Sequence, residues 1–419
     1  MPAYYIWTIG CQMNRAESER LEARLARNGY TPSRRTEDAD VIVLNSCVVR
    51  KHAEDKVVNK LYNLKTLKRD RPDLRIALTG CFVGPDTEEL RKRFPYVDYF
   101  FKPGEIPDWL AVEQGCAAVP EQPGITAFVP IIQGCDNFCS YCIVPYRRGR
   151  EKSRPLSEIV CEVRELARRG TREVTLVGQN VDSYGHDLAG KPDLAELLTE
   201  LNKVEGIARL RFLTNHPKDM SRRLIEAMAR LDKVCQQINL PVQAGDNAVL
   251  EAMHRGYTVE QYRGLVSELR SRMPDIALTT DVIVGFPGET EVQFRNTYSL
   301  LSELKFDAVH AAAYSPRPGT LAAKKYADDV PAAVKKAWLD AIEKLQEGIA
   351  GEINAALPGQ TLEVLVEGKN KGKWQGRTRS DKLVFFIGGA DLTGRLALVH
   401  IEKASPWSLQ GSFQKSKEE

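Results

Sequence analysis

The sequence lacks any apolar run long enough to cross a lipid bilayer. Its first residues, Met1 to Tyr4, also lack the basic and then apolar pattern of a secretion signal. These absences argue against an integral membrane protein and against export, and they predict a cytoplasmic protein with no membrane partner. In that reducing compartment the nine cysteines are more often metal ligands or catalysts than disulfide partners, so their spacing must decide their role.

The sequence also has little net charge, +3 at pH 7, but its basic residues are unevenly distributed. Residues 357–419 contain ten Lys/Arg against seven Asp/Glu. A second basic cluster is opposed locally only by Glu151, and consists of Arg147, Arg148, Arg150, Lys152 and Arg154. Either cluster alone is compatible with a solvated surface, so a phosphate-binding role needs support of another kind.

With 419 residues the chain is too long for one ordinary domain, and its patterns divide it into three segments. The first, residues 1–115, repeats one unit in which an apolar strand ends at a cysteine-bearing loop and a helical stretch follows. The strands are expected at residues 4–8, 41–45 and 75–79, and the cysteines that follow them are Cys11, Cys47 and Cys81. Because the carboxyl ends of parallel strands meet at one sheet edge, these three thiols could lie together. Single cysteines after strands are also common as small buried apolar residues.

The second segment, residues 124–355, follows a Pro- and Gly-containing stretch from Pro103 to Pro123 that we interpret as a linker. Strands and helices alternate in it, which predicts a partial β/α barrel of six units. The six strands are expected at residues 128–132, 173–177, 209–213, 234–240, 277–284 and 308–313. In such barrels the chemistry takes place at the carboxyl ends of the strands.

The third segment, residues 357–419, has short β-prone runs separated by Gly, Lys and Asp. The runs are expected at residues 361–366, 382–386 and 396–401. This pattern predicts a small antiparallel β-barrel, a fold that frequently binds nucleic acid on a basic face. The fold class is therefore α/β, with a parallel N-terminal domain, a partial barrel and a C-terminal β-barrel.

The most specific motif is a C-x3-C-x2-C loop directly after the first strand of the second segment, formed by Cys135, Cys139 and Cys142. Three thiolates on one short loop can bind three irons of a 4Fe-4S cluster and leave the fourth iron open. The amino and carboxylate groups of S-adenosylmethionine (SAM) can chelate that iron. A structural zinc site is the alternative, but it needs four ligands, and no fourth cysteine or paired histidine is near.

Further SAM contacts are expected from residues beside the cysteines and at strand ends on the barrel rim. These candidates are Tyr141, Gly178, Gln179, Asn180, Gln243 and Gly285. Tight turns alone would also explain the glycines.

Motifs in all three segments resemble those of the radical SAM methylthiotransferases. They are Gly10–Asn14, Asn45–Cys47 with Arg50, Gly80–Cys81, the loop from Cys135 to Glu151, Gly178–Asn180, Asp281–Glu289 and Tyr314–Ser315. The resemblance implies that Cys11, Cys47 and Cys81 bind a second, sulfur-bearing 4Fe-4S cluster. It also implies that residues 357–419 form a TRAM domain, a small RNA-binding barrel.

The branch of this family that acts on isopentenylated adenosine beside the tRNA anticodon has Cys-Gln-Met-Asn after its first strand, as at Cys11–Asn14 here. The resemblance then implies methylthio insertion at adenine C2 with two SAM molecules, a tRNA anticodon stem-loop as substrate, an external electron donor and a sulfur source. A monomer is expected. RNA contacts are expected from Arg147, Arg148, Arg150, Lys369, Lys371, Lys373, Arg377 and Arg379, although a solvated β-turn would also explain the last five.

Two alternatives stay open at this point. The first keeps the chemistry but changes the substrate, to threonylcarbamoyl-adenosine in tRNA or to an aspartate of a ribosomal protein. The second is an iron-sulfur protein without turnover that carries electrons or binds RNA.

A few residues depart from the family pattern or match none of it. Ser46 replaces the usual Thr and keeps the hydroxyl, whereas Ala244 replaces the usual Ser and loses it. The remaining cysteines, Cys116, Cys161 and Cys235, match no motif, and we interpret them as ordinary thiols. His216 has a counterpart in the family, and its role is left open.

Overall fold

The computed structural model describes residues 1–48, 51–84, 86–111, 119–389 and 391–417, and its N-terminal part is a parallel α/β domain. Five strands pair in the order β2-β1-β3-β4-β5, all parallel. They are β1 (Ala3–Thr8), β2 (Thr31–Pro32), β3 (Val41–Ser46), β4 (Arg75–Gly80) and β5 (Tyr99–Phe100). The helices are α1 (Gln12–Arg27), α2 (Lys51–Asp70) and α3 (Glu88–Arg93), with short 3-10 turns η1 (Thr36–Asp38) and η2 (Asp108–Leu110). Strand β3 is buried along its whole length, because helices cover both faces of the sheet.

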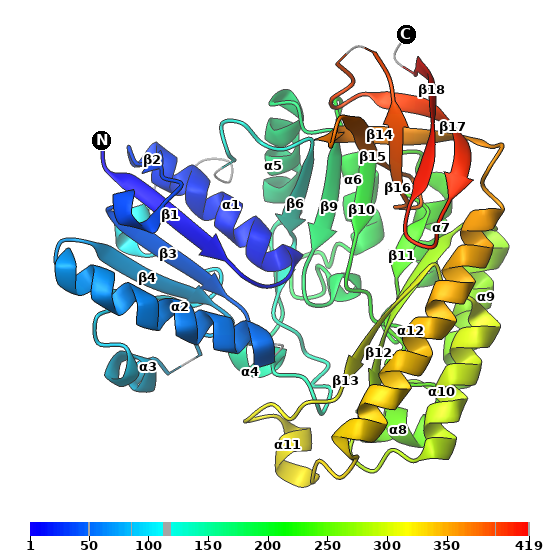
Figure 1. Cartoon of the computed structure of the whole chain (residues 1–419), viewed down its shortest axis with the longest axis horizontal. Helices are drawn as coiled ribbons and strands as arrows, with labels where there is room; N and C mark the ends of the chain where they lie inside the picture. The colour runs from blue at the N-terminus through cyan, green and yellow to red at the C-terminus, as the bar shows by residue number, and fades with distance from the viewer. Residues whose placement is uncertain (49–50, 85, 112–118, 390, 418–419) are drawn as a thin grey trace.

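The middle of the chain contributes two three-stranded parallel sheets (Figure 1). One contains β6 (Thr126–Pro130), β9 (Glu173–Val177) and β10 (Arg209–Phe212), and the other contains β11 (Gln237–Asn239), β12 (Ala277–Val284) and β13 (Ala308–Ala313). An isolated parallel bridge between Leu210 and Val234 connects the two sheets. The six expected strands are therefore confirmed, in a partial barrel with the order β6-β9-β10-β11-β12-β13.

Helices cover the outside of this partial barrel (Figure 1). The longer ones are α5 (Leu156–Arg168), α6 (Leu194–Asn202), α7 (Arg222–Arg230), α9 (Val259–Arg272), α10 (Glu291–Leu304) and α12 (Ala332–Ala355). Shorter elements lie in the loops: β7 (Ile132–Gln133), β8 (Lys152–Ser153), α4 (Val144–Arg148), η3 (Val181–Ser183), α8 (Asn247–Ala252) and α11 (Leu321–Lys325). In the part of the chain that the structure describes, no helix combines the length and the apolar composition needed to cross a bilayer.

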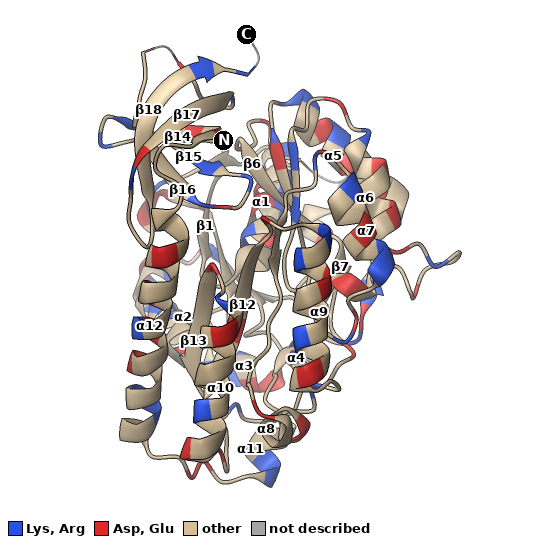
Figure 2. Ribbon diagram, turned by 90° about the vertical axis from the view of Figure 1, so that its right-hand side faces the viewer, with Lys and Arg blue, Asp and Glu red and all other residues tan. Residues whose placement is uncertain are grey.

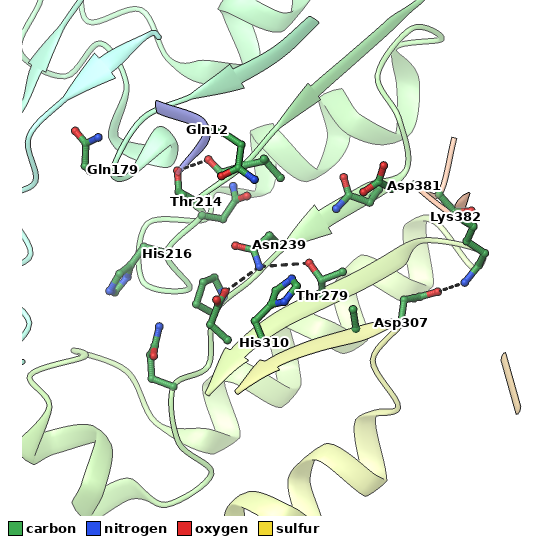
Figure 3. Close-up of a pocket in the computed structure, with 18 of the residues that line it drawn as sticks. Gln12, Gln179, Thr214, His216, Asn239, Thr279, Asp307, His310, Asp381 and Lys382 are labelled. Carbon is green, nitrogen blue, oxygen red and sulfur yellow. Dashed lines mark hydrogen bonds and ion pairs between the residues drawn. The ribbon is translucent and has the colours of Figure 1, made fainter. Parts of the chain in front are cut away.

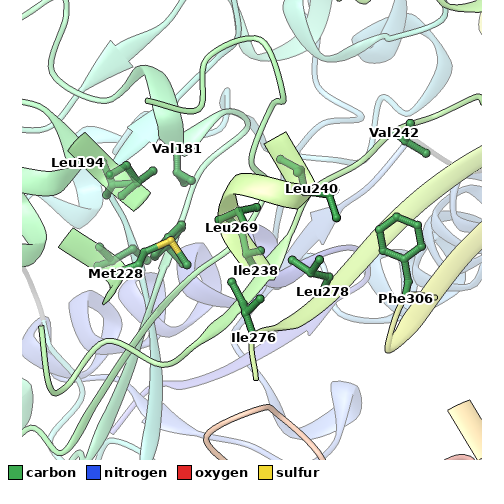
Figure 4. Packing of buried hydrophobic residues seen from close by; sticks show 14 of the residues in the cluster. Val181, Leu194, Met228, Ile238, Leu240, Val242, Leu269, Ile276, Leu278 and Phe306 are labelled. Atoms are coloured by element: carbon green, nitrogen blue, oxygen red, sulfur yellow. The ribbon is translucent and has the colours of Figure 1, made fainter. Parts of the chain in front are cut away.

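The largest hydrophobic core lies between the barrel strands and these helices (Figure 4). Ile238 of β11, Leu240 just after it and Leu278 of β12 point outward and pack with Met228 and Leu269 of helices α7 and α9. All five side chains are buried, and each buried aliphatic side chain contributes about 1.5–3 kcal/mol through removal from water. This packing makes the strands a rigid frame, so the opposite strand face is free to carry polar groups.

The C-terminal segment is a closed five-stranded barrel in the order β14-β15-β16-β18-β17. Its strands are β14 (Thr361–Asn370), β15 (Lys373–Thr378), β16 (Leu383–Ile387), β17 (Leu396–Ala404) and β18 (Leu409–Ser416). The expected barrel is confirmed, with two strands, β15 and β18, that the sequence pattern did not predict. The pairing of β16 with β18 is parallel, whereas the other pairings are antiparallel.

The C-terminal barrel lies against the amino ends of the partial-barrel strands (Figure 1). Arg209 at the start of β10 donates to the backbone oxygen of Arg377 at 2.7 Å and to Glu363 Oε1 at 3.0 Å. Arg211, two residues later, donates to the backbone oxygens of Arg379 (2.9 Å) and Thr378 (2.8 Å). These buried arginines fix the position of the barrel, so that its loops help to line the interior of the partial barrel.

Candidate active site

Three cysteines follow neighbouring strands of the N-terminal sheet at the same level. Thr8, Asn45 and Thr79 are register partners across β1, β3 and β4, and Cys11, Cys47 and Cys81 come two or three residues later. The backbone N–H of Cys81 donates at 2.7 Å to the oxygen of Ser46, the residue before Cys47, and a Cβ on Gly10, the residue before Cys11, would lie 3.0 Å from the Cβ of Cys47. The structure therefore brings the three thiols, which we call the N-terminal thiols, to one sheet edge.

Polar residues of the surrounding motifs hold these loops in place. Asn14 Nδ2 donates to Asn45 Oδ1 at 2.8 Å and to Ser46 O at 3.1 Å. The Sγ of Cys11 lies 3.3 Å from Asn14 Oδ1. Gly80 has a φ of +89°, and a Cβ there would lie 2.3 Å from Ser46 O, so only glycine fits between the two loops.

A buried arginine from the next domain contacts the N-terminal thiols. Arg148, the last residue of α4, donates from Nε to Cys81 Sγ at 3.1 Å and from Nη1 to Glu17 Oε1 at 2.6 Å. Its side chain is 1% exposed. The prediction of an RNA contact for Arg148 is therefore wrong, because the guanidinium group faces the protein interior and its N–H groups are engaged there.

The C-x3-C-x2-C loop forms a second group of three thiols, which we call the barrel thiols: Cys135, Cys139 and Cys142. The backbone N–H of Cys142 donates to Cys139 O at 2.9 Å, and that of Cys135 donates to Gly149 O at 3.2 Å. Burial raises the pKa of Cys135 to about 11 and the pKa of Cys142 to about 12. Such thiols are poor nucleophiles, but a bound iron cluster would stabilise the thiolates, so this donor set fits a metal cluster.

Arg255, which the sequence did not suggest, plays a similar part at the barrel thiols. Its Nη1 donates to Cys139 Sγ at 3.3 Å and lies 3.5 Å from the hydroxyl of Tyr141. Its Nη2 donates to Pro241 O at 3.0 Å, and its Nε to Tyr257 Oη at 3.1 Å. Each group of thiols is thus paired with one buried guanidinium group.

A cavity of about 720 Å³ extends from the barrel thiols through the partial barrel to the C-terminal barrel (Figure 3). Cys135, Cys139, Cys142 and Tyr141 line one end, and Arg377, Asp381 and Lys382 line the other. Polar side chains at alternate positions of β11, β12 and β13 line the middle: Gln237, Asn239, Thr279, Asp281 and His310. The polar face of these strands is a period-2 signal that the sequence contained and that our sequence analysis missed.

The predicted SAM residues fall into two groups. Tyr141, Gln179 and Gln243 line the cavity. Gln179 Oε1 accepts a hydrogen bond from the N–H of Gly134 at 2.6 Å, next to the barrel thiols. Gln243 has a φ of +71° and is bonded through its backbone to β12 beside Asp281.

The other three predicted SAM residues do not line this cavity in the described part of the chain. A Cβ on Gly178 would lie 2.5 Å from Ile132, and Asn180 Nδ2 donates to Asp219 Oδ2 at 2.7 Å. The N–H of Gly285 donates to Glu289 Oε2 at 2.5 Å. Burial raises the pKa of Glu289 to about 7, although two backbone N–H groups act in the opposite direction. Packing and hydrogen bonding within the fold account for these positions.

His216 lies in the cavity wall (Figure 3). Its Nδ1 accepts from the N–H of Lys218 at 3.3 Å, and its buried Nε2 has no hydrogen-bond partner among the described residues. Burial, with the charges of Arg255 and Lys218, lowers the pKa of His216 to about 2. The imidazole is therefore neutral and available to form a hydrogen bond with a ligand.

The remaining basic candidates differ in their availability. Arg379 donates from Nη2 to the backbone oxygens of Asp232 and Val234, at 2.7 and 2.8 Å, so it helps to fix the C-terminal barrel, and an RNA contact from this half-buried residue stays a prediction. Arg150 is exposed and pairs with Asp136 at 2.7 Å, while Arg147 is half-buried. Three lysines of the β14–β15 hairpin are exposed, namely Lys369, Lys371 and Lys373. Figure 2 shows in blue that Lys and Arg occur on several segments of this barrel.

The three cysteines outside the motifs have separate outcomes. Cys235 is a buried free thiol near Arg211. Cys161 is disulfide-bonded, so its interpretation as an ordinary thiol is wrong. Cys116 lies outside the described residues.

Comparison with known proteins matches all three parts of the chain. The model of the Radical SAM superfamily matches residues 129–301, that of the TRAM domain matches residues 355–413, and that of "Uncharacterized protein family UPF0004" matches residues 3–102. Among solved structures, the radical SAM methyltransferase TsrM from Kitasatospora setae is similar, with a TM-score of 0.56 and 15% identity over 77% of each chain. The radical SAM enzyme OxsB has a TM-score of 0.51 and 12% identity, covering 83% of this chain and 56% of its own. These structures share the fold.

The curated relatives are much more similar. A tRNA-2-methylthio-N(6)-dimethylallyladenosine synthase of Dehalococcoides mccartyi is 58% identical over 99% of both chains. Another, of Chloroflexus aurantiacus, is 52% identical over 97% of this chain and 91% of its own. The chain therefore belongs to the tRNA-2-methylthio-N(6)-dimethylallyladenosine synthase family of radical SAM enzymes.

Proposed function

We propose that this chain inserts a methylthio group at C2 of an isopentenyl-modified adenosine next to the tRNA anticodon. The observation that carries the proposal is one cavity with the barrel thiols at one end and the C-terminal barrel at the other, in a chain 58% identical to a synthase of that name. The N-terminal thiols, on the adjoining domain, supply a second set of three ligands. Two 4Fe-4S clusters and SAM are the cofactors that this arrangement fits.

The barrel thiols would hold the cluster that binds SAM. When bound, that cluster supplies the electron that cleaves SAM to methionine and a 5'-deoxyadenosyl radical. Around it, Arg255 holds Cys139 and Tyr141 in position, and Gln179 fixes the start of the loop through Gly134. Tyr141 and Gln243 line the cavity where SAM would lie. Gly178, Asn180 and Gly285 do not line this cavity, and the buried Oδ1 of Asn180 has no hydrogen-bond partner among the described residues, so SAM contacts from these three residues stay a prediction.

The N-terminal thiols would hold the cluster that carries the sulfur. Three thiols at one sheet edge would bind three irons of a 4Fe-4S cluster. The fourth iron would then have no cysteine ligand and could bind an added sulfur atom. Asn14 and Ser46 hold the loops of Cys11 and Cys47, and Arg148 contacts Cys81. Cys11 is exposed, so a sulfur source can reach this edge.

The polar strand face of the cavity would orient the nucleoside. The C2–H bond of adenine has no usable acidity, so a general base among these residues could not remove its proton. The residues of this strand face need only position the adenine ring. Asn239 Nδ2 donates to Asp281 Oδ2 at 2.9 Å, which leaves the amide oxygen of Asn239 available to a ligand (Figure 3). The unpartnered Nε2 of His216 supplies another contact in the same wall.

The C-terminal barrel would bind the RNA next to the target nucleoside. Trp407 lines the cavity and is 60% exposed, and Arg377 and Lys382 line the same end. An exposed tryptophan beside cationic side chains is suited to stacking on an unpaired nucleobase. The three lysines of the β14–β15 hairpin would contact phosphates.

Replacing Trp407 tests this assignment. Trp407→Ala should weaken tRNA binding roughly 5- to 150-fold, because stacking on one base contributes about 1–3 kcal/mol. Fluorescence anisotropy with a labelled anticodon stem-loop measures the dissociation constant. Trp407→Phe should retain most of the affinity, and Ile387→Ala, at another exposed apolar side chain of the barrel, should leave it unchanged. Equal affinities for Trp407→Ala and the unaltered protein would contradict a stacking role.

We further propose an external electron donor, a separate sulfur source, a cytoplasmic location and action as a monomer. The decisive test of function is mass spectrometry of tRNA nucleosides from cells with and without the gene. We expect the methylthio form of isopentenyladenosine to disappear and the unmodified isopentenyladenosine to accumulate. Loss of methylthiolation from threonylcarbamoyl-adenosine, or from a ribosomal protein, would contradict the proposal in favour of the corresponding substrate.

A further inference from the structure

We propose that Arg148 is a positioning residue that raises the reduction potential of the cluster held by the N-terminal thiols. The proposal rests on the proposed function only in requiring a cluster at Cys11, Cys47 and Cys81. It concerns a residue of the radical SAM domain that acts on a ligand of the other domain.

The guanidinium group of Arg148 is fixed in one orientation by its two partners. Nη1 and Nη2 donate to the two carboxylate oxygens of Glu17 at 2.6 and 3.2 Å. Because the guanidinium group is planar, this two-point contact fixes the direction of the remaining Nε–H group. Its nitrogen lies 3.1 Å from Cys81 Sγ, a close contact for an N–H···S hydrogen bond.

Glu17 and Arg148 form more than a buried ion pair. A buried pair is costly to desolvate, and Glu17 already satisfies one side of the guanidinium group. The other side is directed at the thiol of Cys81. Glu17 lies on α1, the helix whose N-cap residue is Cys11. Helix α1, which begins at Cys11, thus holds the guanidinium group of Arg148 beside the N-terminal thiols through Glu17.

The electrostatic consequence follows from the sign of the charge. Reduction adds an electron to a cluster of thiolate-bound irons, and a nearby cation with an N–H···S hydrogen bond stabilises the reduced state. Arg255 makes the matching contact to Cys139 in the other group. Arg148 also follows Cys142 by only six residues, so it couples the position of the N-terminal thiols to the loop of the barrel thiols.

The test uses the full-length chain with Cys135→Ala, Cys139→Ala and Cys142→Ala, so that only the N-terminal cluster can form. In this parent, Arg148→Gln should move the reduction potential to a more negative value, while Glu17→Gln, which removes a nearby negative charge, should move it to a more positive one. Arg148→Lys keeps the positive charge but not the planar guanidinium group. It should also move the reduction potential to a more negative value, but by less than Arg148→Gln. Arg150→Gln, at an exposed arginine two residues away, is the matched control and should give no shift. A redox titration followed by electron paramagnetic resonance measures each potential, with iron content determined in parallel.

The directions of the two potential shifts, in Arg148→Gln and in Glu17→Gln, distinguish an electrostatic role of Arg148 from a merely structural one. Damage to the loop would move the potential in the same direction in the Arg148→Gln and Glu17→Gln variants, or would lower the iron content of both. An unchanged potential in Arg148→Gln, with iron content equal to that of the parent, overturns the proposal. If Arg148→Gln loses its iron, the double variant Glu17→Gln with Arg148→Gln, which buries no unpaired charge, decides instead, and an unchanged potential there overturns the proposal. A parent that binds no iron overturns the second cluster of the proposed function as well.

Discussion

Cys142→Ala should abolish the formation of 5'-deoxyadenosine from SAM, whereas Cys47→Ala should still form it, and neither variant should make methylthio product. Cys142 lines the cavity, and its loss removes one of the three barrel thiols needed for electron delivery to SAM. Cys47 lies at the edge of the N-terminal sheet, so its replacement leaves the loop of the barrel thiols intact. Mass spectrometry of reactions reduced with dithionite measures the nucleoside product. Each variant should retain about four irons, compared with about eight in the unaltered protein.

Cys47 is a better choice than Cys81 for this comparison. Cys81 contacts Arg148, which belongs to the segment that follows the barrel thiols, so its replacement would disturb both groups. Cys235→Ala, at a buried free thiol outside both groups, is the matched control and should keep both the iron and the activity. If Cys47→Ala forms no 5'-deoxyadenosine while the cluster at the barrel thiols is still visible by spectroscopy, SAM cleavage also depends on the N-terminal thiols. That result would contradict the separate roles proposed for the two groups of thiols.

Much of the fold could be predicted because strands and cysteines follow local rules. The expected strands at residues 173–177, 277–284 and 308–313 agree with β9, β12 and β13 to the residue. The grouping of the N-terminal thiols followed from parallel strand order alone, because parallel strands in register end at one edge. Strand β11 is shorter than the expected range 234–240, since Val234 forms the isolated bridge with Leu210 and the N–H of Cys235 donates to Leu210 O instead of continuing the ladder with β12.

The two missed strands of the C-terminal barrel have weak patterns. Strand β15 has only Trp374 as a large buried apolar side chain, with Gly376 and Thr378 at the other inward positions. Strand β18 contains two Ser, two Gln and a Gly, so no alternation is visible. Barrel closure, a tertiary effect, stabilises both strands through pairing with their neighbours on each side.

The contacts of individual arginines could not be predicted from the sequence. Arg147, Arg148 and Arg150 are nearly adjacent, yet Arg148 is buried against Cys81 while Arg150 is exposed. Arg148 ends the short helix α4 and Arg150 lies two residues beyond it, so no helical periodicity relates their environments. Arg255 contacts Cys139 across 116 residues of sequence, a separation at which only the folded chain shows the pairing.

Replacing Arg211 should destabilise the protein by about 3 kcal/mol, because it breaks a buried ion pair and leaves Glu173 with the more distant Arg209, whose Nη1 lies 3.9 Å from Glu173 Oε2. Arg211 Nε lies 3.1 Å from Glu173 Oε1, and both side chains are almost fully buried, at 4% and 6% exposed. The same guanidinium group donates to the backbone oxygens of Thr378 and Arg379 in the C-terminal barrel. Arg211→Met should therefore lower the free energy of unfolding and also loosen the barrel that lines one end of the cavity. Urea denaturation measures the first effect, and limited proteolysis within residues 357–419 measures the second.

The double variant Glu173→Gln with Arg211→Met separates the two causes. Removing both charges should recover part of the lost stability, because the carboxylate that lost its nearer cation is no longer buried, but the barrel should stay loose, since its carbonyl groups still lack their donor. Arg222→Met, at an exposed arginine paired with Glu268 at 3.4 Å, should change the free energy of unfolding by less than about 1 kcal/mol. If Arg211→Met is as stable as Arg222→Met and equally resistant to protease, the buried arginines do not hold the C-terminal barrel, and the cavity must depend on other contacts for its far end.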